Sequence, residues 1–311
     1  MTKNISLITG SGVLSAYLAN YLILKKHKVI VTTRKYRKVY KNFKYLNIQK
    51  KVKFEKLDIL SKKNIFKILN KYSPKNIFYF SGQSSLTKSI KLKKETLQSN
   101  FIGPKNFLEV LEKQKNKANF LKANTGYIFK PNNGLISLNS KLSKNSNPYI
   151  KSQIKIFRLI KKFRKKEVNC FNIIFLQVES PLRDKDFFIK KICLNAYKKK
   201  KVTVGNIKSV RDYSWAPEII KGVYYITKLK PCDMILSSGK GISGEKIIKV
   251  AYQKFGLNYK KFTKINKKYI RRNEVKVLIG SKNNQNILKK KFNWKLKIFG
   301  EKLVKKMLAN I

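Results

Sequence analysis

The sequence predicts an α/β protein, a Rossmann-type doubly wound parallel sheet followed by a smaller, mixed C-terminal portion. Three observations favour this fold class. Short apolar runs alternate with helical patterns through the first half, glycines follow the first apolar run, and the regular rhythm ends after Gln177. A repeated order of strand and helix implies parallel strands with helices on both faces.

The first half contains the alternating elements in chain order. The runs are Asn4 to Thr9, AYLANYLILKK, VIVTT from Val29, KVKFEKLD from Lys51, IFKILNKY, NIFYFSG from Asn76, FLEVLEKQ and NFLKANTG from Asn119. NPY from Asn147 opens a helix that we expect to reach about Arg164, and VNCFNIIFLQ from Val168 predicts another apolar strand. Because ligands bind beyond the carboxyl ends of strands in such sheets, function is expected in the loops that follow the strands.

The second half contains shorter elements. Helical patterns lie near Asp186 to Tyr197, Ala216 to Thr227, Gly244 to Lys254 and Gly300 to Ala309. We therefore expect a cofactor-binding Rossmann domain at residues 1–177, which continues in part into the C-terminal half. A smaller substrate-binding portion is expected at residues 178–311.

The composition excludes several classes of protein. With 311 residues, 42% of them hydrophobic, the chain can bury a sizeable core, and no run approaches the roughly 18 apolar residues of a membrane span. No signal-peptide pattern precedes the first apolar run, so a cytoplasmic location is expected, without a membrane partner. Cys170, Cys193, Cys232 and the single His27 are too few and too scattered for a metal site, so we expect reduced thiols and no metal.

The charge is the most unusual bulk property. The chain has 73 Lys and Arg residues against 15 Asp and Glu, a formal net charge of +58, and only eight of the basic residues are arginine. The lysines are spread along the chain, whereas a dedicated nucleic-acid binder clusters its basic residues and favours arginine. We interpret the charge as a lysine-rich background, expect no specific nucleic-acid partner, and keep polyanion binding as an alternative.

The turn after the first apolar run reads TGSGVLSA and contains Gly10 and Gly12. Glycines at such a turn let the backbone approach a pyrophosphate, and the helix that follows supplies free N–H groups. A lone G-x-G is weak evidence, so an ordinary strand-to-helix turn remains the alternative.

Residues after the next strands complete the expected cofactor site. The second strand ends in VTTRKYR with no acidic residue, so Arg34 favours the 2′-phosphate of NADP over the free ribose of NAD. Asp58 follows the third strand and is expected to hydrogen-bond the adenine. Ser81 and Gln83 follow the fourth strand, where small residues suit close passage of a cofactor, and Thr125 follows the fifth.

With these features in place, three segments of the second half resemble the GDP-mannose 4,6-dehydratase branch of the extended short-chain dehydrogenase/reductase family. The segments are VESPLRDKDFFIKKI (Val178 to Ile192), GNIKSVRDYSWA (Gly205 to Ala216) and RRNEVKVLIG with the later FNWK. The resemblance covers the chain from Ile5 to about Ile298. It implies an NADP-dependent lyase that converts GDP-mannose to GDP-4-keto-6-deoxymannose, and a homo-oligomer, either a dimer or a tetramer.

The resemblance also implies roles for individual residues. Thr125 would hydrogen-bond the sugar, Tyr149 would take the C4 hydroxyl proton, and Glu179 would lie beside the nicotinamide. The nucleotide-sugar set would be Gln177, Lys191, Arg211, Arg271 and Glu274. A basic set suits a pyrophosphate, because guanidinium groups form paired, charge-assisted hydrogen bonds with its oxygens.

Two positions depart from the family pattern. The lysine expected four residues after the tyrosine is Gln153, and the glutamate expected two residues after the threonine is Tyr127. A phenol needs about 4 kcal/mol of stabilisation to act as a base near pH 7, and a helix N-terminus supplies only about 0.3–1 kcal/mol. Gln153 can still bond the cofactor ribose but carries no charge, so a Gln153→Lys exchange is expected to raise activity. Tyr127 is a poor replacement for a carboxylate acid/base.

These departures leave several functions open. The first is a nucleotide-sugar 4,6-dehydratase with GDP-mannose as the favoured substrate. The second is a related nucleotide-sugar epimerase or reductase, or a catalytically degenerate protein that keeps the binding sites. The third is a polyanion-binding protein that uses its positive surface.

Overall fold

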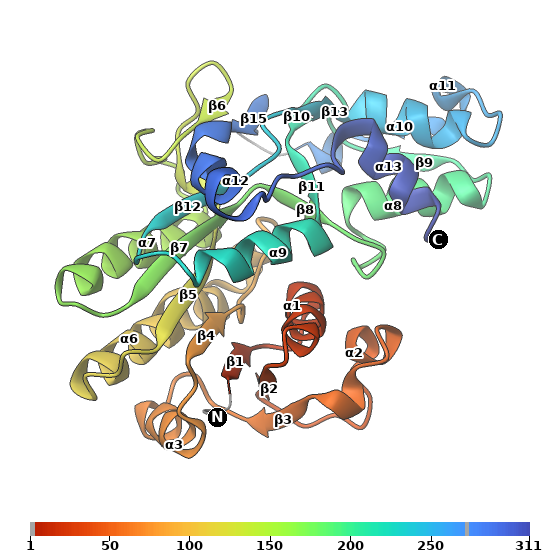
Figure 1. Cartoon of the computed structure of the whole chain (residues 1–311). Helices are drawn as coiled ribbons and strands as arrows, with labels where there is room; N and C mark the ends of the chain where they lie inside the picture. Colours follow the sequence, from red (N-terminus) through yellow and green to blue (C-terminus); the bar gives the residue numbers. More distant parts are fainter. Residues whose placement is uncertain (1–3, 271–273) are drawn as a thin grey trace. The chain divides into compact units, whose positions relative to one another are not determined.

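The chain folds into two compact units, which a computed structural model describes at residues 4–270 and 274–311 (Figure 1). The first unit consists of Met1–Lys130, Leu142–Ile174 and Val223–Met234, and the second of Pro131–Lys141, Phe175–Gly222 and Ile235–Ile311. The first unit therefore takes one short segment from the C-terminal half of the chain. The predicted assignment of cofactor binding to residues 1–177 and substrate binding to 178–311 stays a prediction.

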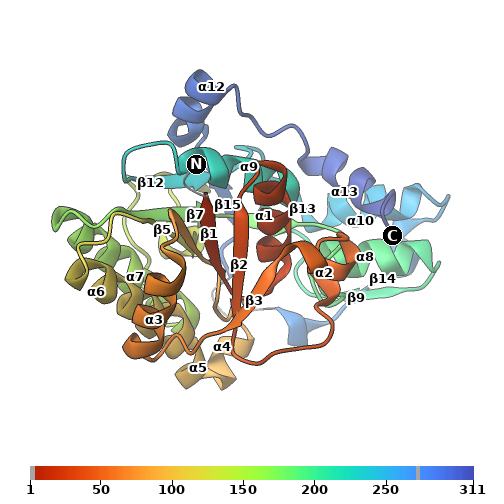
Figure 2. The same cartoon turned by 60° about the horizontal axis from the view of Figure 1, so that its bottom comes forward.

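The first unit is built on a seven-stranded sheet in the order β12-β7-β5-β4-β1-β2-β3. Its strands are β1 (Ile5–Thr9), β2 (Lys28–Thr33), β3 (Lys53–Lys56), β4 (Asn76–Tyr79), β5 (Asn119–Thr125), β7 (Cys170–Phe175) and β12 (Asp233–Leu236). The pairs β1/β2, β1/β4, β2/β3 and β4/β5 are parallel, and Figure 2 shows β1, β2 and β3 side by side. The predicted Rossmann-type sheet is confirmed.

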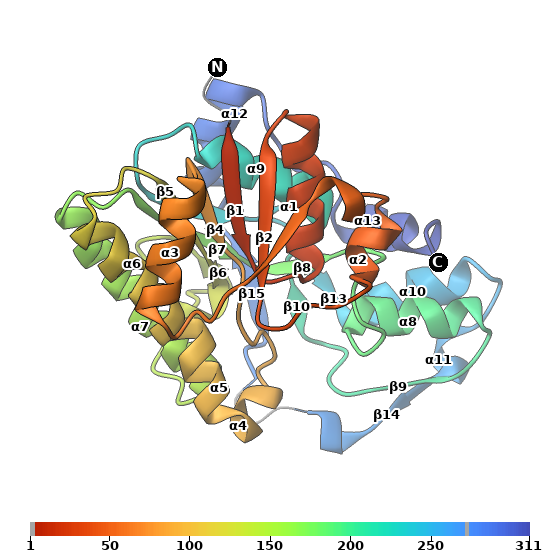
Figure 3. The same ribbon diagram turned by 90° about the horizontal axis from the view of Figure 1, so that it is seen from below.

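Helices cover both faces of this sheet. They are α1 (Val13–Leu24), α2 (Lys41–Tyr45), α3 (Lys62–Tyr72), α4 (Lys88–Lys91), α5 (Lys93–Leu97), α6 (Gly103–Lys113) and α7 (Pro148–Lys165). Figure 3 shows α3 and α6 on one side of the strands and α1 on the other. On the first face, Leu7 and Phe120 of the strands pack with Ile68, Phe107 and Ile160 of α3, α6 and α7 in one buried cluster. Residues of one strand alternate between the faces, so Lys122 points to the same face as Phe120.

Helix α7 begins at a well-defined cap. The Tyr149 backbone N–H donates to Asn147 Oδ1 at 3.0 Å, and Pro148 occupies the first turn, where its missing N–H costs nothing. Asn147 is itself held, because its Nδ2 donates to the carbonyl of Leu86 at 3.0 Å and Ser89 Oγ donates to its Oδ1 at 3.1 Å. The start of α7 is therefore fixed to the segment that follows β4.

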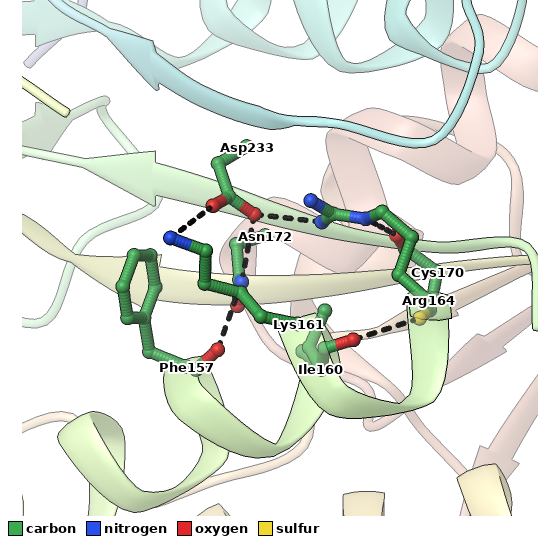
Figure 4. Close-up of polar contacts among 7 residues, drawn as sticks. All are labelled: Phe157, Ile160, Lys161, Arg164, Cys170, Asn172 and Asp233. Atoms are coloured by element: carbon green, nitrogen blue, oxygen red, sulfur yellow. Dashed lines mark hydrogen bonds and ion pairs between the residues drawn. The ribbon is translucent and has the colours of Figure 1, made fainter. Parts of the chain in front are cut away.

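The other end of α7 is fixed by a partly buried carboxylate. Asp233 of β12 accepts hydrogen bonds from Arg164 Nη2 at 2.6 Å and from Asn172 Nδ2 at 2.9 Å (Figure 4). The same arginine donates from Nε to the carbonyl of Cys170 at 2.9 Å. One carboxylate thus joins α7, β7 and β12, and the helix is held along its length.

The second unit contains smaller sheets and its own core. A four-stranded sheet has the order β13-β10-β15-β6, and two pairs of strands are β11-β8 and β14-β9. The strands are β6 (Leu135–Ile136), β8 (Gln177–Glu179), β9 (Val202–Val204), β10 (Val210–Arg211), β11 (Tyr213–Trp215), β13 (Ile242–Ser243), β14 (Thr263–Ile265) and β15 (Val277–Gly280). The helices are α8 (Phe188–Tyr197), α10 (Gly244–Gln253), α11 (Tyr259–Phe262), α12 (Asn286–Phe292) and α13 (Gly300–Leu308), and α9 (Ala216–Ile226) contributes to both units. Helices α8, α10 and α13 supply most of the buried apolar cluster.

One predicted strand is wrong in its extent. The apolar run from Val168 predicts a single strand to Gln177, but β7 ends at Phe175 and β8 begins at Gln177. The backbone N–H of Gln177 donates to the carbonyl of Asp212 at 3.1 Å, and β8 pairs with β11 instead of continuing in the seven-stranded sheet. The chain changes sheets at this point, which an apolar pattern does not reveal.

The structure also places the cysteines. Cys170 and Cys193 are buried, Cys232 is partly buried, and all three are free thiols. Within residues 4–270 and 274–311, no helix has both the length and the apolar character needed to cross a membrane.

Candidate active site

Gly10 and Gly12 shape the turn after β1. Gly10 has φ +83°, which favours glycine, and a Cβ there would lie 3.1 Å from Ser81 Oγ. Gly12 caps α1, and a Cβ at this position would meet nothing within 4 Å. The first turn of α1 has neither an acidic residue nor a capping side chain. The turn therefore leaves open space in front of free backbone donors, which suits an anionic group.

The ends of β1 and β4 are joined beside this turn. Thr9 Oγ1 accepts hydrogen bonds from the backbone N–H groups of Phe80 and Ser81, each at 3.1 Å. Gln83 uses its side chain within its own loop, where Nε2 donates to the carbonyl of Ser85 at 2.7 Å and Oε1 accepts from the Ser85 N–H. Of the two predicted residues after β4, Ser81 faces the glycine turn, whereas the Gln83 side chain stabilises its loop.

Arg34 and Asp58 follow the carboxyl ends of β2 and β3. These strands neighbour β1 in the parallel sheet, so both residues lie at the same edge as the glycine turn. Both side chains are exposed, and Asp58 Oδ1 accepts the N–H of Leu60 at 2.9 Å. The edge thus presents a guanidinium group to solvent after β2, and its binding of a 2′-phosphate stays a prediction.

The carboxyl end of β5 meets the beginning of α7. Asn124 Nδ2 donates to the backbone carbonyl of Gln153 at 3.3 Å, and its Oδ1 accepts the N–H of Thr125 at 2.8 Å. Tyr149 lies one helical turn before Gln153, and 8% and 4% of their surfaces are exposed. Thr125 Oγ1 accepts the N–H of Tyr127, which is partly buried, at 3.4 Å. The four predicted catalytic residues therefore belong to one junction of strand and helix.

Lys122 belongs to the same junction and was not predicted. Its side chain is buried in β5, and Nζ donates to Gln153 Oε1 at 3.3 Å and to the carbonyl of Ala123. Nζ also lies 5.6 Å from the ring centroid of Tyr79, its neighbour on β4. Burial lowers the pKa of Lys122 to about 7. A lysine inside the apolar run NFLKANT is the signal for this residue, and the abundance of lysine elsewhere hides it.

The second unit brings together part of the predicted nucleotide-sugar set. Arg211 is buried, and its Nη2 lies 3.3 Å from Glu274 Oε1. Its Nη1 donates to the carbonyls of Val210 and Lys276 at 2.8 and 3.1 Å. Asn206, which was not predicted, donates from Nδ2 to Glu274 Oε2 at 3.3 Å. The Arg211 guanidinium is thus oriented by three acceptors.

Lys191 lies in α8 of the second unit. Its Nζ donates to the carbonyl of Thr203 at 2.7 Å and lies 5.3 Å from the centroid of the Tyr269 ring. The predicted residue Arg271 lies outside the described residues. Lys191 therefore contacts β9, whereas Arg211 of β10 contacts Glu274.

Glu179 is a buried carboxyl group in β8. It is 3% exposed, and its Oε2 has no hydrogen-bond partner among the described residues. Burial raises its pKa to about 7, while Arg183 and Lys190 act in the opposite direction. Gln177, at the other end of β8, is partly buried. A carboxyl group that titrates near neutral pH is typical of functional sites.

Comparisons with known proteins show which sequences are similar to this chain. The sequence profile of one family, described as GDP-mannose 4,6 dehydratase, matches residues 7–307. The chain is 23% identical to the GDP-mannose 4,6 dehydratase of Dictyostelium discoideum over 344 residues, which cover 99% of this chain and 95% of that protein.

Solved structures share the fold. UDP-glucose 4-epimerase of Thermotoga maritima, determined with UDP-glucose, superposes with a TM-score of 0.83 at 18% identity and covers 98% of both chains. The dTDP-glucose 4,6-dehydratase of Bacillus anthracis, determined with NAD, has a TM-score of 0.83 at 15% identity, with 98% of this chain and 96% of that chain covered. At this identity, the likeness establishes the fold.

Proposed function

Because the chain belongs to the GDP-mannose 4,6-dehydratase family of nucleotide-sugar dehydratases and epimerases, we propose that it is an NADP-dependent 4,6-dehydratase acting on GDP-mannose. The observation that carries the proposal is the junction of β5 and α7, where Thr125, Tyr149 and Gln153 come together. This junction lies at the carboxyl edge of a parallel sheet, where such folds bind ligands.

The residues present fit a dinucleotide cofactor. The open space at Gly12 and the free N–H groups of α1 would receive the pyrophosphate. Arg34 would bind the 2′-phosphate of NADP, because the end of β2 carries a guanidinium group and no carboxylate. The chemistry that NADP would supply when bound is the uptake of a hydride from C4 of the sugar and its return to C6.

The residues that would carry out catalysis lie at the β5–α7 junction. Thr125 would hydrogen-bond the sugar, and Tyr149 would take the proton of the C4 hydroxyl. The cap of α7 and the Asp233 contacts hold Tyr149 in place, so this proton transfer would need little rearrangement. Tyr127 stands where the family has its carboxylate base, and proton removal from C5 would be slow with a phenol in that role.

The second unit would bind the nucleotide sugar. Arg211, oriented by Glu274 and two carbonyls, would keep its remaining guanidinium face for a phosphate. Lys191 would add a second positive charge, and Gln177, Glu274 and Arg271 remain in the proposed set. Glu179, with a pKa near 7, would be a neutral or charged neighbour of the nicotinamide according to pH.

One observation favours a second candidate function. Tyr127 follows Thr125 in the position where dehydration requires a carboxylate. Among the described residues of this junction, Thr125, Asn124 and Gln153 are neutral and do not replace that carboxylate. A related nucleotide-sugar 4-epimerase needs a hydride to be removed from C4 and returned there, and a reductase needs a hydride to be delivered to a keto group, but neither reaction needs this base. A degenerate protein that only binds its ligands belongs to the same candidate.

The test is incubation of the purified protein with NADP and GDP-mannose, followed by mass spectrometry of the sugar nucleotide. A 4,6-dehydratase yields a product that has lost one water and carries a 4-keto group, and Tyr149→Phe is the inactive control. A product of unchanged mass and altered stereochemistry would support the epimerase. Intact GDP-mannose, with binding of both ligands detected by calorimetry, would support the degenerate protein.

A further inference from the structure

Lys122 is buried at a position where a charged side chain destabilises the folded state. Of the lysines in the described parts of the chain it alone is buried, with 2% of its surface exposed. Among the same residues it forms no ion pair with a carboxylate, and its Nζ contacts only neutral groups. A buried ammonium group without an acidic partner is unfavourable, so its position calls for a function.

The contact with Gln153 determines the orientation of an amide. A glutamine side chain has one carbonyl acceptor and two N–H donors, whereas a protonated lysine can only donate. Lys122 Nζ at 3.3 Å therefore turns the Gln153 carbonyl toward β5. The Nε2 donors then point away from β5, and Tyr149 lies four residues earlier on the same face of α7.

We propose that Lys122 is the positioning residue for Tyr149 and supplies from β5, through the Gln153 amide, the positive charge that is missing at position 153 of α7. The inference rests on the proposed role of Tyr149 as acid/base. Lys122 fixes the amide, the amide presents its donors on the tyrosine side of the helix, and the nearby charge stabilises the phenolate. In a water-poor junction such a charge acts over a longer range than it would at the surface.

The charge state of Lys122 gives the inference a measurable pH dependence. Burial lowers its pKa to about 7, so it loses its charge within the range in which enzymes are assayed. Among the described residues, the other titratable groups on this face include Tyr79 on β4, Tyr72 on α3, Cys170 on β7 and Tyr149 itself. Burial raises the pKa of Tyr79 well above its ordinary value and that of Cys170 to about 12, so neither changes charge near pH 7.

The first experiment measures kcat/KM for GDP-mannose dehydration against pH in the wild type, in Lys122→Met and in the control Lys151→Met, which changes an exposed lysine of α7. We expect Lys122→Met to lower kcat/KM about tenfold or more near pH 7 and to remove the fall in rate above about pH 7. Lys151→Met should keep the wild-type profile. A folded Lys122→Met protein with the wild-type profile, or with a lower rate and an unchanged profile, overturns the inference.

The second experiment moves the positive charge from β5 to α7. Lys122→Gln should be impaired, and adding Gln153→Lys should restore activity, because the ammonium group then lies on α7. Gln153→Lys alone is not expected to raise activity, in contrast to the expectation from sequence, because it places a second ammonium group beside Lys122. A double variant no more active than Lys122→Gln contradicts the inference.

A third measurement separates this inference from the proposed function. The ionisation of Tyr149 is followed by carbon NMR of labelled tyrosine rings in the protein with NADP, and Tyr149→Phe identifies the signal. We expect its titration midpoint to rise by about one pH unit or more in Lys122→Met. If GDP-mannose is not dehydrated by any variant, the proposed function fails while this result still decides the role of Lys122. An unchanged midpoint overturns the inference even in an active enzyme.

Discussion

At the scale of single residues, the chain buries two ionisable groups whose charge is weakly compensated. Lys122 in the first unit and Glu179 in the second both have a pKa of about 7, the lysine lowered and the carboxyl group raised by burial. Each shift disfavours the charged form in the folded state. The two groups therefore give the stability of the protein opposite dependences on pH, and each dependence can be measured without substrate.

Lys122→Met is expected to stabilise the protein at and below neutral pH. An unfolded lysine stays protonated to about pH 10.4, whereas folded Lys122 has a pKa of about 7, so the unfolded state binds more protons between these values. The stability of the wild type then rises with pH above about 7, and below that the penalty is on the order of 5 kcal/mol. Urea unfolding at several pH values should show the advantage of Lys122→Met shrinking as pH rises. A constant difference would contradict a buried charge at this position, and Lys151→Met is the exposed control.

The buried carboxyl group of Glu179 is expected to give stability the opposite dependence on pH, and Glu179→Gln tests it. The folded carboxyl group has a raised pKa of about 7 and an unfolded one titrates near about 4.3, so the folded state binds more protons between these values. Wild-type stability falls across this window and stays lower above it, by about 3 kcal/mol. Thermal unfolding of Glu179→Gln should lack this fall. Glu301→Gln, at a side chain 47% exposed, should behave as the wild type.

Arg34→Ala tests the cofactor preference. The exposed guanidinium group after β2 is expected to contact only the 2′-phosphate, so its loss should weaken NADP binding about tenfold or more and leave NAD binding almost unchanged. Calorimetric titration with both cofactors measures the difference, and the exposed Arg37 provides a matched Arg37→Ala control. An equal loss of affinity for NADP and for NAD would show that Arg34 does not bind the 2′-phosphate.

At the scale of secondary-structure elements, α7 connects the stability of the fold to the candidate chemistry. Asn147 fixes its first turn to Leu86 and Ser89, and Arg164 fixes its last turn to Asp233. Tyr149 and Gln153, the two residues of α7 that are proposed for catalysis, lie in the first two turns, between these anchors. A helix held at both ends keeps Tyr149 at a constant position relative to the end of β5.

Asp233→Asn is expected to destabilise the first unit by about 3 kcal/mol. The exchange leaves Arg164, whose side chain is 23% exposed, without its carboxylate, and removing one partner of a pair that is largely shielded from water is costly. Chemical denaturation measures the loss. Glu112→Gln breaks the exposed pair with Lys166 and should cost no more than about 1 kcal/mol. If both variants lose equally little stability, Asp233 does not anchor α7.

At the scale of the whole molecule, the outstanding property is a formal net charge of +58. Most lysines of the described residues are exposed, Lys122 being the buried exception, and each unit has its own apolar core, so the charge is mainly a property of the surface. Such a surface raises the local concentration of anions, which include nucleotide sugars and NADP. The same field would hold nucleic acids without selecting a sequence.

Nucleic-acid binding is therefore expected to depend steeply on salt. A complex formed by diffuse lysine contacts should lose about a thousandfold in affinity between roughly 50 and 200 mM salt, because each neutralised phosphate releases counterions. NADP binding involves fewer phosphates and should weaken far less. Fluorescence anisotropy with labelled single- and double-stranded oligonucleotides measures the slope. Tight binding that persists at the higher salt would favour a polyanion-binding function over an enzyme.

Much of the fold could be predicted from local patterns. The helices predicted near Asp186, Ala216, Gly244 and Gly300 correspond to α8, α9, α10 and α13 within a few residues at each end. Apolar periodicity carries this information, because a helix or strand must bury one face. The change of sheet at Leu176 could not be predicted, because it depends on the pairing of Gln177 with Asp212, a residue distant in sequence.

The sequence by itself determined the parallel sheet, the glycine turn and the positions of Tyr149 and Gln153, because each depends on residues close together along the chain. It also showed that the lysine of the family is absent from α7. Only the tertiary structure decided which residue lies beside Gln153. The packing of β5 against α7 brings Lys122 there from 31 positions away, and a single lysine among many cannot be recognised as buried until the fold has excluded water from it.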